Sequence, residues 1–507
     1  MFIQTVAQVL VEVKCLKKRS SGILMHISSL PSKYGIGDFG KEAYKFVDFL
    51  VKANQKNWQI LPLGVTGFGD SPYQCFSAFA GNPYFIDIEE LIDLGYLNIE
   101  DAEGADLGND KNYVDYGKLY INKMGLLRKA YASGRVELSE ELTKFYYEHK
   151  EWLREFSLFM AIKEANDNIS WNKWDDSYKY ADSKEVLEFE KNNQEKIYFW
   201  VFTQYFFLKQ WLALKKYANN NGIKIIGDLP IYVAEDSSDA WANPEYFNLD
   251  ENLVTKTVAG CPPDGFTDTG QLWGNPIYNW ENLKNTGYNW WVRRIKHSFE
   301  LFDSLRIDHF RGFDAYWEIR NGEETAINGR WTKGPGMQLF DKIKEELGEL
   351  DIIAEDLGFY TESLGQLLKD TGFPNMKVLQ FAFDTKGDSH FLPHNYDRNS
   401  VVYIGTHDNH TAIAWFNTAP KDEFEYAVKY FNIDPNEGLN WGLIRGAWSS
   451  PSYLAIAQMQ DFLGLGEESR MNEPSTIGTN WKWRIEKSVL TTELAEKIAD
   501  LTYLYRR

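Results

Sequence analysis

The segment SLRIDHF (residues 304–310) is the best guide to the fold, because a short apolar run ends there in Asp308. DIIAEDLG (351–358) and VVYIGTHD (401–408) follow the same plan, each passing from an apolar run into acidic or polar residues. Such runs are typical of strands that are buried on both faces of a parallel sheet. We therefore expect three parallel strands whose carboxyl ends carry polar side chains.

Similar runs occur elsewhere in the chain, and helical patterns lie between them. Further strands are expected from the runs that begin at Gly22, Asn57, Ile223 and Lys377, with an eighth near Ala455–Leu463. Helices are expected over residues 39–54, 205–222, 336–348 and 361–372. This alternation indicates βαβ units, and eight strands favour an α/β fold of the (β/α)₈ TIM-barrel type over an open doubly wound sheet.

Two long segments interrupt the alternation. Residues 87–200 are helical in pattern and rich in Glu, Lys and Asp, and they predict an inserted helical subdomain. Residues 230–285 are rich in Pro, Gly and aromatic residues and follow the third strand, so we expect an elaborated, substrate-covering loop region at the C-terminal face of the barrel, the face that carries function in this fold. The predicted organisation is an extension over residues 1–18 and a barrel over 19–507.

The composition argues against several kinds of partner. The net charge is −19, whereas nucleic acids and anionic membranes attract basic surfaces. We expect neither as a partner, and the charge suits an enzyme with a neutral substrate. The chain also contains 18 Trp and 29 Tyr, whose rings can stack on sugars, although most must belong to the core.

The cysteines and the N-terminus indicate a cytoplasmic protein. Cys15, Cys75 and Cys261 are an odd, widely spaced set that forms neither a disulfide framework nor a CxxC metal site. The basic residues near Lys17 follow the first apolar run, whereas a signal peptide places its charges before that run.

Three carboxylates stand at the ends of three predicted strands: Asp308, Glu355 and Asp408. In a barrel these strand ends converge on one mouth. Retaining glycoside chemistry needs a carboxylate nucleophile and a carboxylic acid about 5–5.5 Å apart. Arg306 lies on the same face of its strand as Asp308 and would favour an ionised nucleophile. The apolar residues before Glu355 would raise its pKa, as a general acid requires.

Non-catalytic interpretations of these acidic residues remain open at this point. A single acidic residue at a strand end is often a helix cap or a surface residue. His407 and His410 flank Asp408, but a zinc site needs further ligands, and no phosphate-binding glycine loop occurs. We predict neither a metal nor a cofactor.

Longer motifs carry a resemblance that spans residues 19–484. They include GDSPYQCFSAFAGNPYFIDI, PPDGFTDTGQLWGNPIYNW, RIDHFRGF, IIAEDLG, GTHDNHT and RMNEPSTIGTNWKWR. In these motifs the chain resembles the amylomaltase or 4-α-glucanotransferase family, the disproportionating enzymes. The resemblance implies a retaining transferase that moves α-1,4-glucan segments between maltooligosaccharides. We expect a monomer or homodimer, although the sequence does not determine which.

The resemblance also assigns roles to matching positions. It implies that Asp308 is the nucleophile, Glu355 the general acid/base and Asp408 a carboxylate that stabilises the transition state. It implies substrate contacts for Tyr73, Asp264, Gln271, Trp273, Arg306, His407 and Asn472. Asp228 is expected to order the barrel mouth. Ser475 stands where the family usually has Gly, and we expect it to alter the local backbone because Gly tolerates φ values that Ser avoids.

Two other functions fit the same residues. An α-amylase-like hydrolase would use the same carboxylates with water as the acceptor. A catalytically silent glucan-binding protein is less consistent with three retained carboxylates.

Overall fold

A closed barrel of parallel strands forms the centre of the protein. The computed structural model of the chain describes residues 17–67, 69–263 and 267–507. The strand order around the barrel is β1-β12-β11-β10-β9-β6-β3-β2. The bounds are β1 Ser20–Leu24, β2 Asn57–Gln59, β3 Lys224–Pro230, β6 Ser304–Asp308, β9 Ile352–Ala354, β10 Asn375–Val378, β11 Ser400–Tyr403 and β12 Leu454–Gln458. The predicted (β/α)₈ TIM barrel is confirmed.

The register of β3 and β6 shows how the barrel directs polar side chains into its mouth. Asp228 pairs with Arg306, and their side chains form an ion pair. Because successive side chains alternate, Asp308 shares this face, while Leu305 and Ile307 are buried on the other. An apolar strand can therefore carry two charged residues at its carboxyl end.

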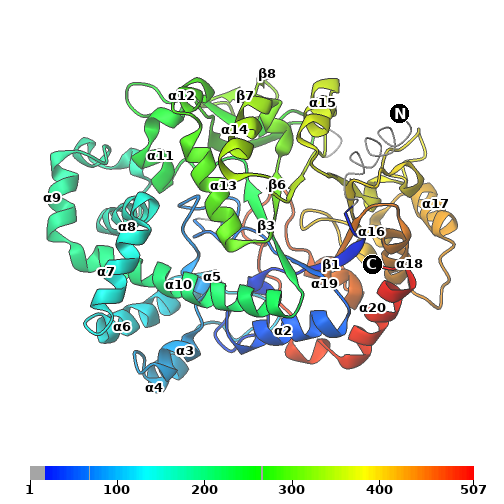
Figure 1. Cartoon of the computed structure of the whole chain (residues 1–507), viewed down its shortest axis with the longest axis horizontal. Helices are drawn as coiled ribbons and strands as arrows, with labels where there is room; N and C mark the ends of the chain where they lie inside the picture. Colours follow the sequence, from blue (N-terminus) through cyan, green and yellow to red (C-terminus); the bar gives the residue numbers. More distant parts are fainter. Residues whose placement is uncertain (1–16, 68, 264–266) are drawn as a thin grey trace, which may run out of the picture.

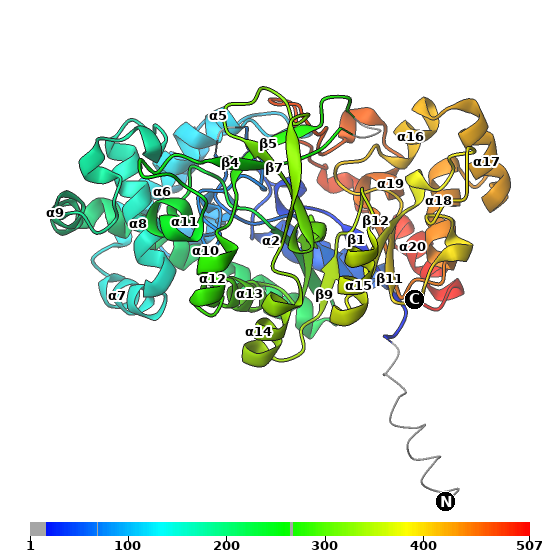
Figure 2. The same cartoon turned by 90° about the horizontal axis from the view of Figure 1, so that it is seen from above.

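Helices surround the barrel (Figures 1 and 2). Those that follow or flank the barrel strands are α2 Lys41–Lys52, α13 Asn289–Leu301, α14 Met337–Leu347, α15 Glu362–Thr371, α16 Ala412–Thr418, α17 Lys421–Phe431, α18 Leu439–Ser449, α19 Met459–Leu463 and α20 Thr492–Leu504. The four helices predicted from sequence correspond to α2, α10 (Gln194–Asn220), α14 and α15. Within the described ranges, no helix is long and apolar enough to cross a membrane.

A group of helices follows β2 and precedes β3 in the chain, and it lies at the left in Figure 1. Its members are α3 Ile88–Asp93, α4 Ile99–Gly104, α5 Tyr116–Lys118, α6 Met124–Gly134, α7 Ser139–Glu148, α8 Lys150–Ala165, α9 Lys184–Asn192 and α10 Gln194–Asn220. Helix α10 packs against α6, α7 and α8 and also against α2 and β3 of the barrel. One long helix thus joins this group to the barrel.

A second sheet, which the sequence analysis did not predict, lies beside the barrel. Its order is β5-β4-β7-β8, with β4 Thr257–Cys261, β5 Gln271–Pro276, β7 Ala315–Arg320 and β8 Gly329–Lys333, all antiparallel. The segment 230–285, expected as a loop region, therefore contributes two strands as well as the short helices α11 Ser238–Ala242 and α12 Trp280–Asn285.

The predicted bounds of the eighth strand were wrong. Residues Leu454–Gln458 form β12, but Met459–Leu463 form α19, which ends at Gly464 with φ 65°. A short apolar run does not distinguish a buried strand from a buried helix, and this run contains both. Similarly, β10 ends at Val378, and Leu379–Phe381 form a 3-10 turn.

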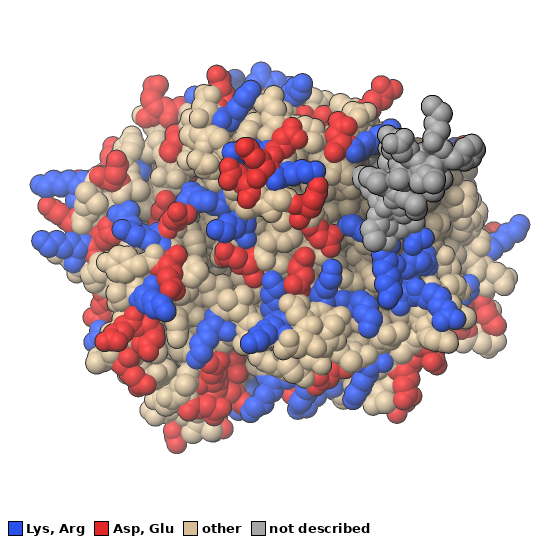
Figure 3. Space-filling model, in the orientation of Figure 1, with Lys and Arg blue, Asp and Glu red and all other residues tan. Residues whose placement is uncertain are grey.

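Acidic and basic side chains are interspersed over the face shown in Figure 3. The excess negative charge of the chain is thus not gathered there into one patch.

Candidate active site

Asp308 lies at the carboxyl end of β6 and is held by Arg306. The Nη2 of Arg306 donates to Asp308 Oδ1 (2.9 Å), and its Nη1 lies 2.7 Å from both carboxylate oxygens of the buried Asp228. Tyr73 donates its hydroxyl to the same Asp228 (2.9 Å). One fixed guanidinium therefore joins two carboxylates and orients Asp308, which agrees with the expectation that Asp228 orders the barrel mouth.

Glu355 follows β9 and is oriented by two backbone N–H groups. His309 N donates to Glu355 Oε2 and Leu357 N donates to Oε1, both at 2.7 Å. His309 has φ 50°, in the left-handed region that residues with a side chain seldom adopt, and the turn that it makes directly follows Asp308. His309, which directly follows Asp308, therefore holds the carboxylate of Glu355 in place.

The two carboxyl groups are set for different protonation states. Burial raises the pKa of Glu355 to about 8, and the neighbouring Asp308 adds to this while Arg306 opposes it. Burial also raises the pKa of Asp308 to about 6, against the guanidinium of Arg306. The expectation that Arg306 alone would favour ionisation overlooked this burial. Glu355 therefore keeps its proton to a higher pH than Asp308, as an acid and a nucleophile require.

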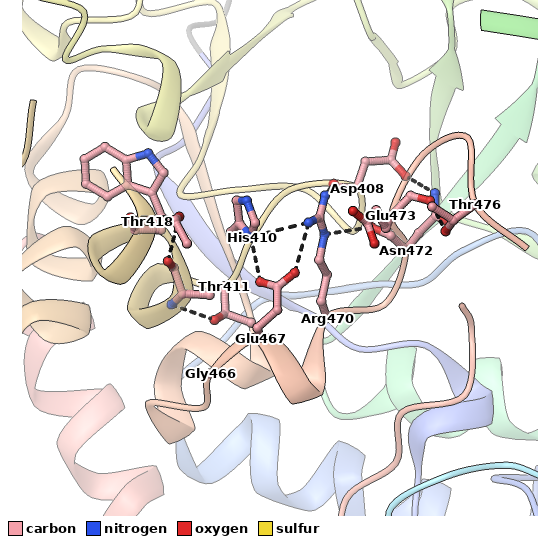
Figure 4. A network of polar contacts seen from close by, with 12 residues as sticks. Asp408, His410, Thr411, Thr418, Gly466, Glu467, Arg470, Asn472, Glu473 and Thr476 are labelled. Atoms are coloured by element: carbon pink, nitrogen blue, oxygen red, sulfur yellow. Dashed lines mark hydrogen bonds and ion pairs between the residues drawn. The ribbon is translucent and has the colours of Figure 1, made fainter. Parts of the chain in front are cut away.

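Asp408 belongs to a polar network that follows β11 (Figure 4). Asn472 Nδ2 donates to Asp408 Oδ1 (2.6 Å), and His407 Nε2 lies 3.2 Å from the same oxygen. Arg470 donates to the Asp408 carbonyl oxygen (2.7 Å) and pairs with Glu467 (3.0 Å). Two of the predicted substrate contacts, His407 and Asn472, thus hold Asp408.

The ring of Tyr73 stacks on His407, with centroids 5.1 Å apart and an interplanar angle of 14°. Trp481 packs against both rings, at 5.7 Å from Tyr73 and 5.8 Å from His407. Tyr73 is therefore tied to Asp228 by its hydroxyl and to the Asp408 loop by its ring. Trp481 was missed from the sequence, although it lies within the motif that also contains Asn472.

Trp273 on β5 contacts His309, the residue that follows Asp308. Its ring meets His309 edge to face, with centroids 4.8 Å apart, and its Nε1 donates to Gln271 Oε1 (3.1 Å). The second sheet therefore brings Gln271 and Trp273 to the barrel mouth. Asp264, the remaining predicted contact, lies outside the described residues. In the part of the chain that the structure describes, no group of three or more His, Cys, Asp or Glu side chains is arranged to hold a metal ion.

Ser475 has φ 66°, the left-handed region in which a side chain is strained. We expect Ser475→Gly to raise the free energy of unfolding by about 0.5–1 kcal/mol, because the relief of strain exceeds the added entropy of the unfolded chain. Urea unfolding measures the change. Thr476→Gly is the matched control, since Thr476 has no positive φ and its hydroxyl bonds Glu473 O and Asn480; it should destabilise the protein. Destabilisation by Ser475→Gly would contradict this account.

A barrel whose mouth brings together carboxyl groups from three strand ends has the arrangement of a glycoside-processing barrel enzyme. The sequence profile of the family described as 4-alpha-glucanotransferase matches residues 25–491, and the chain belongs to this family.

Close relatives and a solved structure agree with this assignment. A 4-alpha-glucanotransferase of Clostridium butyricum is 54% identical over 95% of this chain and 100% of its own length. One from Streptococcus pneumoniae is 52% identical over 97% of this chain and 98% of its own. The structure of amylomaltase from Streptococcus agalactiae in complex with acarbose is 45% identical, covers 97% of this chain and 100% of its own, and has a TM-score of 0.94.

Proposed function

We propose that this protein transfers α-1,4-glucan segments between maltooligosaccharides by a double displacement at Asp308 and Glu355. The observation that carries the proposal is the pairing of these two carboxyl groups. They end neighbouring strands, a single backbone N–H beside Asp308 holds Glu355, and their pKa values of about 6 and about 8 suit a nucleophile and an acid.

In the first step, Asp308 attacks the anomeric carbon while Glu355 gives its proton to the departing glycosidic oxygen. The glycosidic bond breaks, and an ester joins the glucan to Asp308 with its configuration inverted. In the second step, Glu355 removes the proton from the 4-hydroxyl of an acceptor glucan, which displaces Asp308 and restores the α configuration. Asp408 stabilises the positive charge that develops on the sugar ring in both steps.

The surrounding residues divide into two sides in this proposal. Tyr73, Arg306, His407 and Asn472 contact the donor sugar, since all four lie within the network that joins Asp228 to Asp408. Gln271 and Trp273, with Asp264, contact the acceptor, since β5 carries the first two to the His309 side of Asp308.

Incubation of the purified protein with maltotriose tests the proposal, with products resolved by chain length. We expect glucose and a ladder of longer oligosaccharides, with little gain in reducing ends. Glucose and maltose alone would indicate a hydrolase instead. Binding of glucan without turnover, even of longer donors, would indicate a silent binding protein.

A plot of kcat/KM for transfer against pH should be bell-shaped. Transfer requires Asp308 ionised, so kcat/KM should rise with pH up to about 6, the pKa of Asp308. It also requires Glu355 protonated, so kcat/KM should fall as pH passes about 8. Initial rates of transfer from maltotriose between pH 4 and 10 measure both limbs, and a rate that keeps rising beyond pH 9 would contradict the role of Glu355.

Trp273 should determine how well water is excluded as an acceptor. Its ring covers His309 beside the nucleophile, so Trp273→Ala should admit water to the ester and raise the hydrolysis-to-transfer ratio by roughly tenfold, equivalent to about 1.4 kcal/mol. Reducing-end assays against product ladders measure the ratio. Tyr503→Ala, on α20 with its ring 66% exposed, serves as the control. An unchanged ratio in Trp273→Ala would rule out this role.

We also propose that the protein is cytoplasmic, which the odd number of cysteines and the net charge support, and that it acts as a monomer or homodimer. In its organisation, residues 87–200 would form a helical subdomain and 230–285 the substrate-covering region of a catalytic barrel over 19–507. Of the proposed extension, 1–18, all but Lys17 and Lys18 lies outside the described residues.

A further inference from the structure

We propose that Trp331 and Phe359, supported by Arg311, form an additional binding subsite for the acceptor glucan, beyond the residues at the reacting bond. This inference rests on the proposed transferase function. We call these three residues the Trp331 cluster. They come from β8, from the loop after β9 and from the turn after β6.

The connections of the cluster place it beside the two reactive carboxyl groups. Arg311 follows Asp308 by three residues, in the 3-10 turn Phe310–Phe313, and Phe359 follows Glu355 by four. Both loops meet at Trp331. The cluster is therefore attached to Asp308 and Glu355 and not to the Tyr73–Asp228–Asp408 side, which we assign to the donor.

Trp331 is fixed in place yet open to solvent. The guanidinium of Arg311 lies over one face of its ring, 3.9 Å from the centroid. The rings of Trp317 and Phe359 meet it edge to face, with centroids at 5.2 and 6.1 Å. Trp331 is nevertheless 42% exposed and Phe359 40%. Because Arg311 covers one face of Trp331, the exposure belongs to the remaining face and edges.

The register of the second sheet extends this surface as far as β5. Leu272 pairs with Gly260, Gly260 with Trp317, and Trp317 with Trp331. Residues paired across neighbouring strands project on the same face, so these side chains form one row. Leu272 is 40% exposed, and because side chains alternate along a strand it projects on the face of the sheet opposite to Trp273. Gly260 leaves the row without a side chain in the middle. An apolar strip thus runs from the acceptor strand β5 to Phe359.

Arg311 supplies a second, polar observation. Its side chain is only 3% exposed, and its Nε and Nη1 have no hydrogen-bond partner among the described residues. These donors are covered by the protein beneath the ring, so Arg311 serves to hold Trp331, whose open face can stack on the apolar face of a pyranose. The continuity of the strip with the carboxylate loops favours a glucan chain over a protein partner.

Acceptors of different length test the proposal. With one donor, transfer to glucose and to maltoheptaose is compared in the wild type, Trp331→Ala, Phe359→Ala and Trp331→Phe. In both alanine variants, the ratio of kcat/KM for maltoheptaose to that for glucose should fall about tenfold, and Trp331→Phe should keep most of it. Tyr503→Ala on α20 removes a ring that is 66% exposed and should leave the ratio unchanged. Melting temperatures verify that each variant folds.

The outcomes separate this inference from the function on which it rests. A wild type without transfer would remove the proposed function. A transferring wild type whose alanine variants keep the acceptor ratio would overturn the subsite alone. Sedimentation tests the alternative that the strip is an interface between copies of the chain. If the wild type is a dimer, and Trp331→Ala makes it a monomer without changing the acceptor ratio, the glucan subsite is overturned.

Discussion

Replacing Asp308 with asparagine is expected to lower the rate of transfer from maltotriose on the order of 10⁴-fold or more. The amide has the shape of the carboxylate but cannot attack the anomeric carbon, so no ester forms. The fold should survive, because Arg306 keeps its ion pair with the buried Asp228. Quantified oligosaccharide ladders measure the loss.

The control for Asp308→Asn comes from the same loop. Asp314 accepts hydrogen bonds from the hydroxyls of Thr361 and Ser363, and we expect Asp314→Asn to change the rate by only a few fold. Equal losses in the two variants would mean that Asp308 acts through structure and not as the nucleophile.

Glu355→Gln should lower transfer from maltotriose by about 10²–10⁴-fold, the usual contribution of general acid catalysis. α-Maltosyl fluoride provides the diagnostic, because fluoride departs without a proton from the enzyme. With this donor the first step should recover, while the second still lacks its base. The ester on Asp308 should then accumulate and be detectable as an added mass on the peptide that contains Asp308.

A pH profile and a control variant complete this experiment. The fall in rate above pH 8 should disappear in Glu355→Gln, since the group that titrates there is gone. Glu362→Gln, in the first turn of α15, is the matched control and should behave as wild type. A loss with the fluoride as large as that with maltotriose would contradict the acid role.

The sequence predicted those parts of the fold that depend on local pattern. Buried parallel strands are short apolar runs, so all eight were found, and their last residues indicated Asp308 and Glu355. The sheet β5-β4-β7-β8 was missed because its pairing joins residues far apart, such as Gly260 and Trp317. Its strands are also partly exposed and irregular.

The site was predicted as a set of residues but not as a set of contacts. Motif resemblance indicated Asn472 and Tyr73 as sugar contacts, yet the structure has Asn472 on Asp408 and the Tyr73 hydroxyl on Asp228. The direction in which each of these side chains points depends on tertiary packing, which a sequence motif does not reveal. Arg306 lowers the pKa of Asp308 as expected, but burial at the mouth, which the sequence does not reveal, has the larger effect and raises it to about 6.

The three carboxylates come from β6, β9 and β11, and the chain order of these strands has a kinetic consequence. β11 is completed on its outer side by β12, which in turn pairs with β1 at the start of the described chain. During refolding, the contacts that hold Asp408 form only when the first and last strands of the barrel have met, because Tyr73, which follows β2, stacks on His407, and Asn472, which follows β12, bonds Asp408. Recovery of activity should lag behind recovery of the helical circular dichroism signal. The rate at which activity returns would then measure how fast the barrel closes.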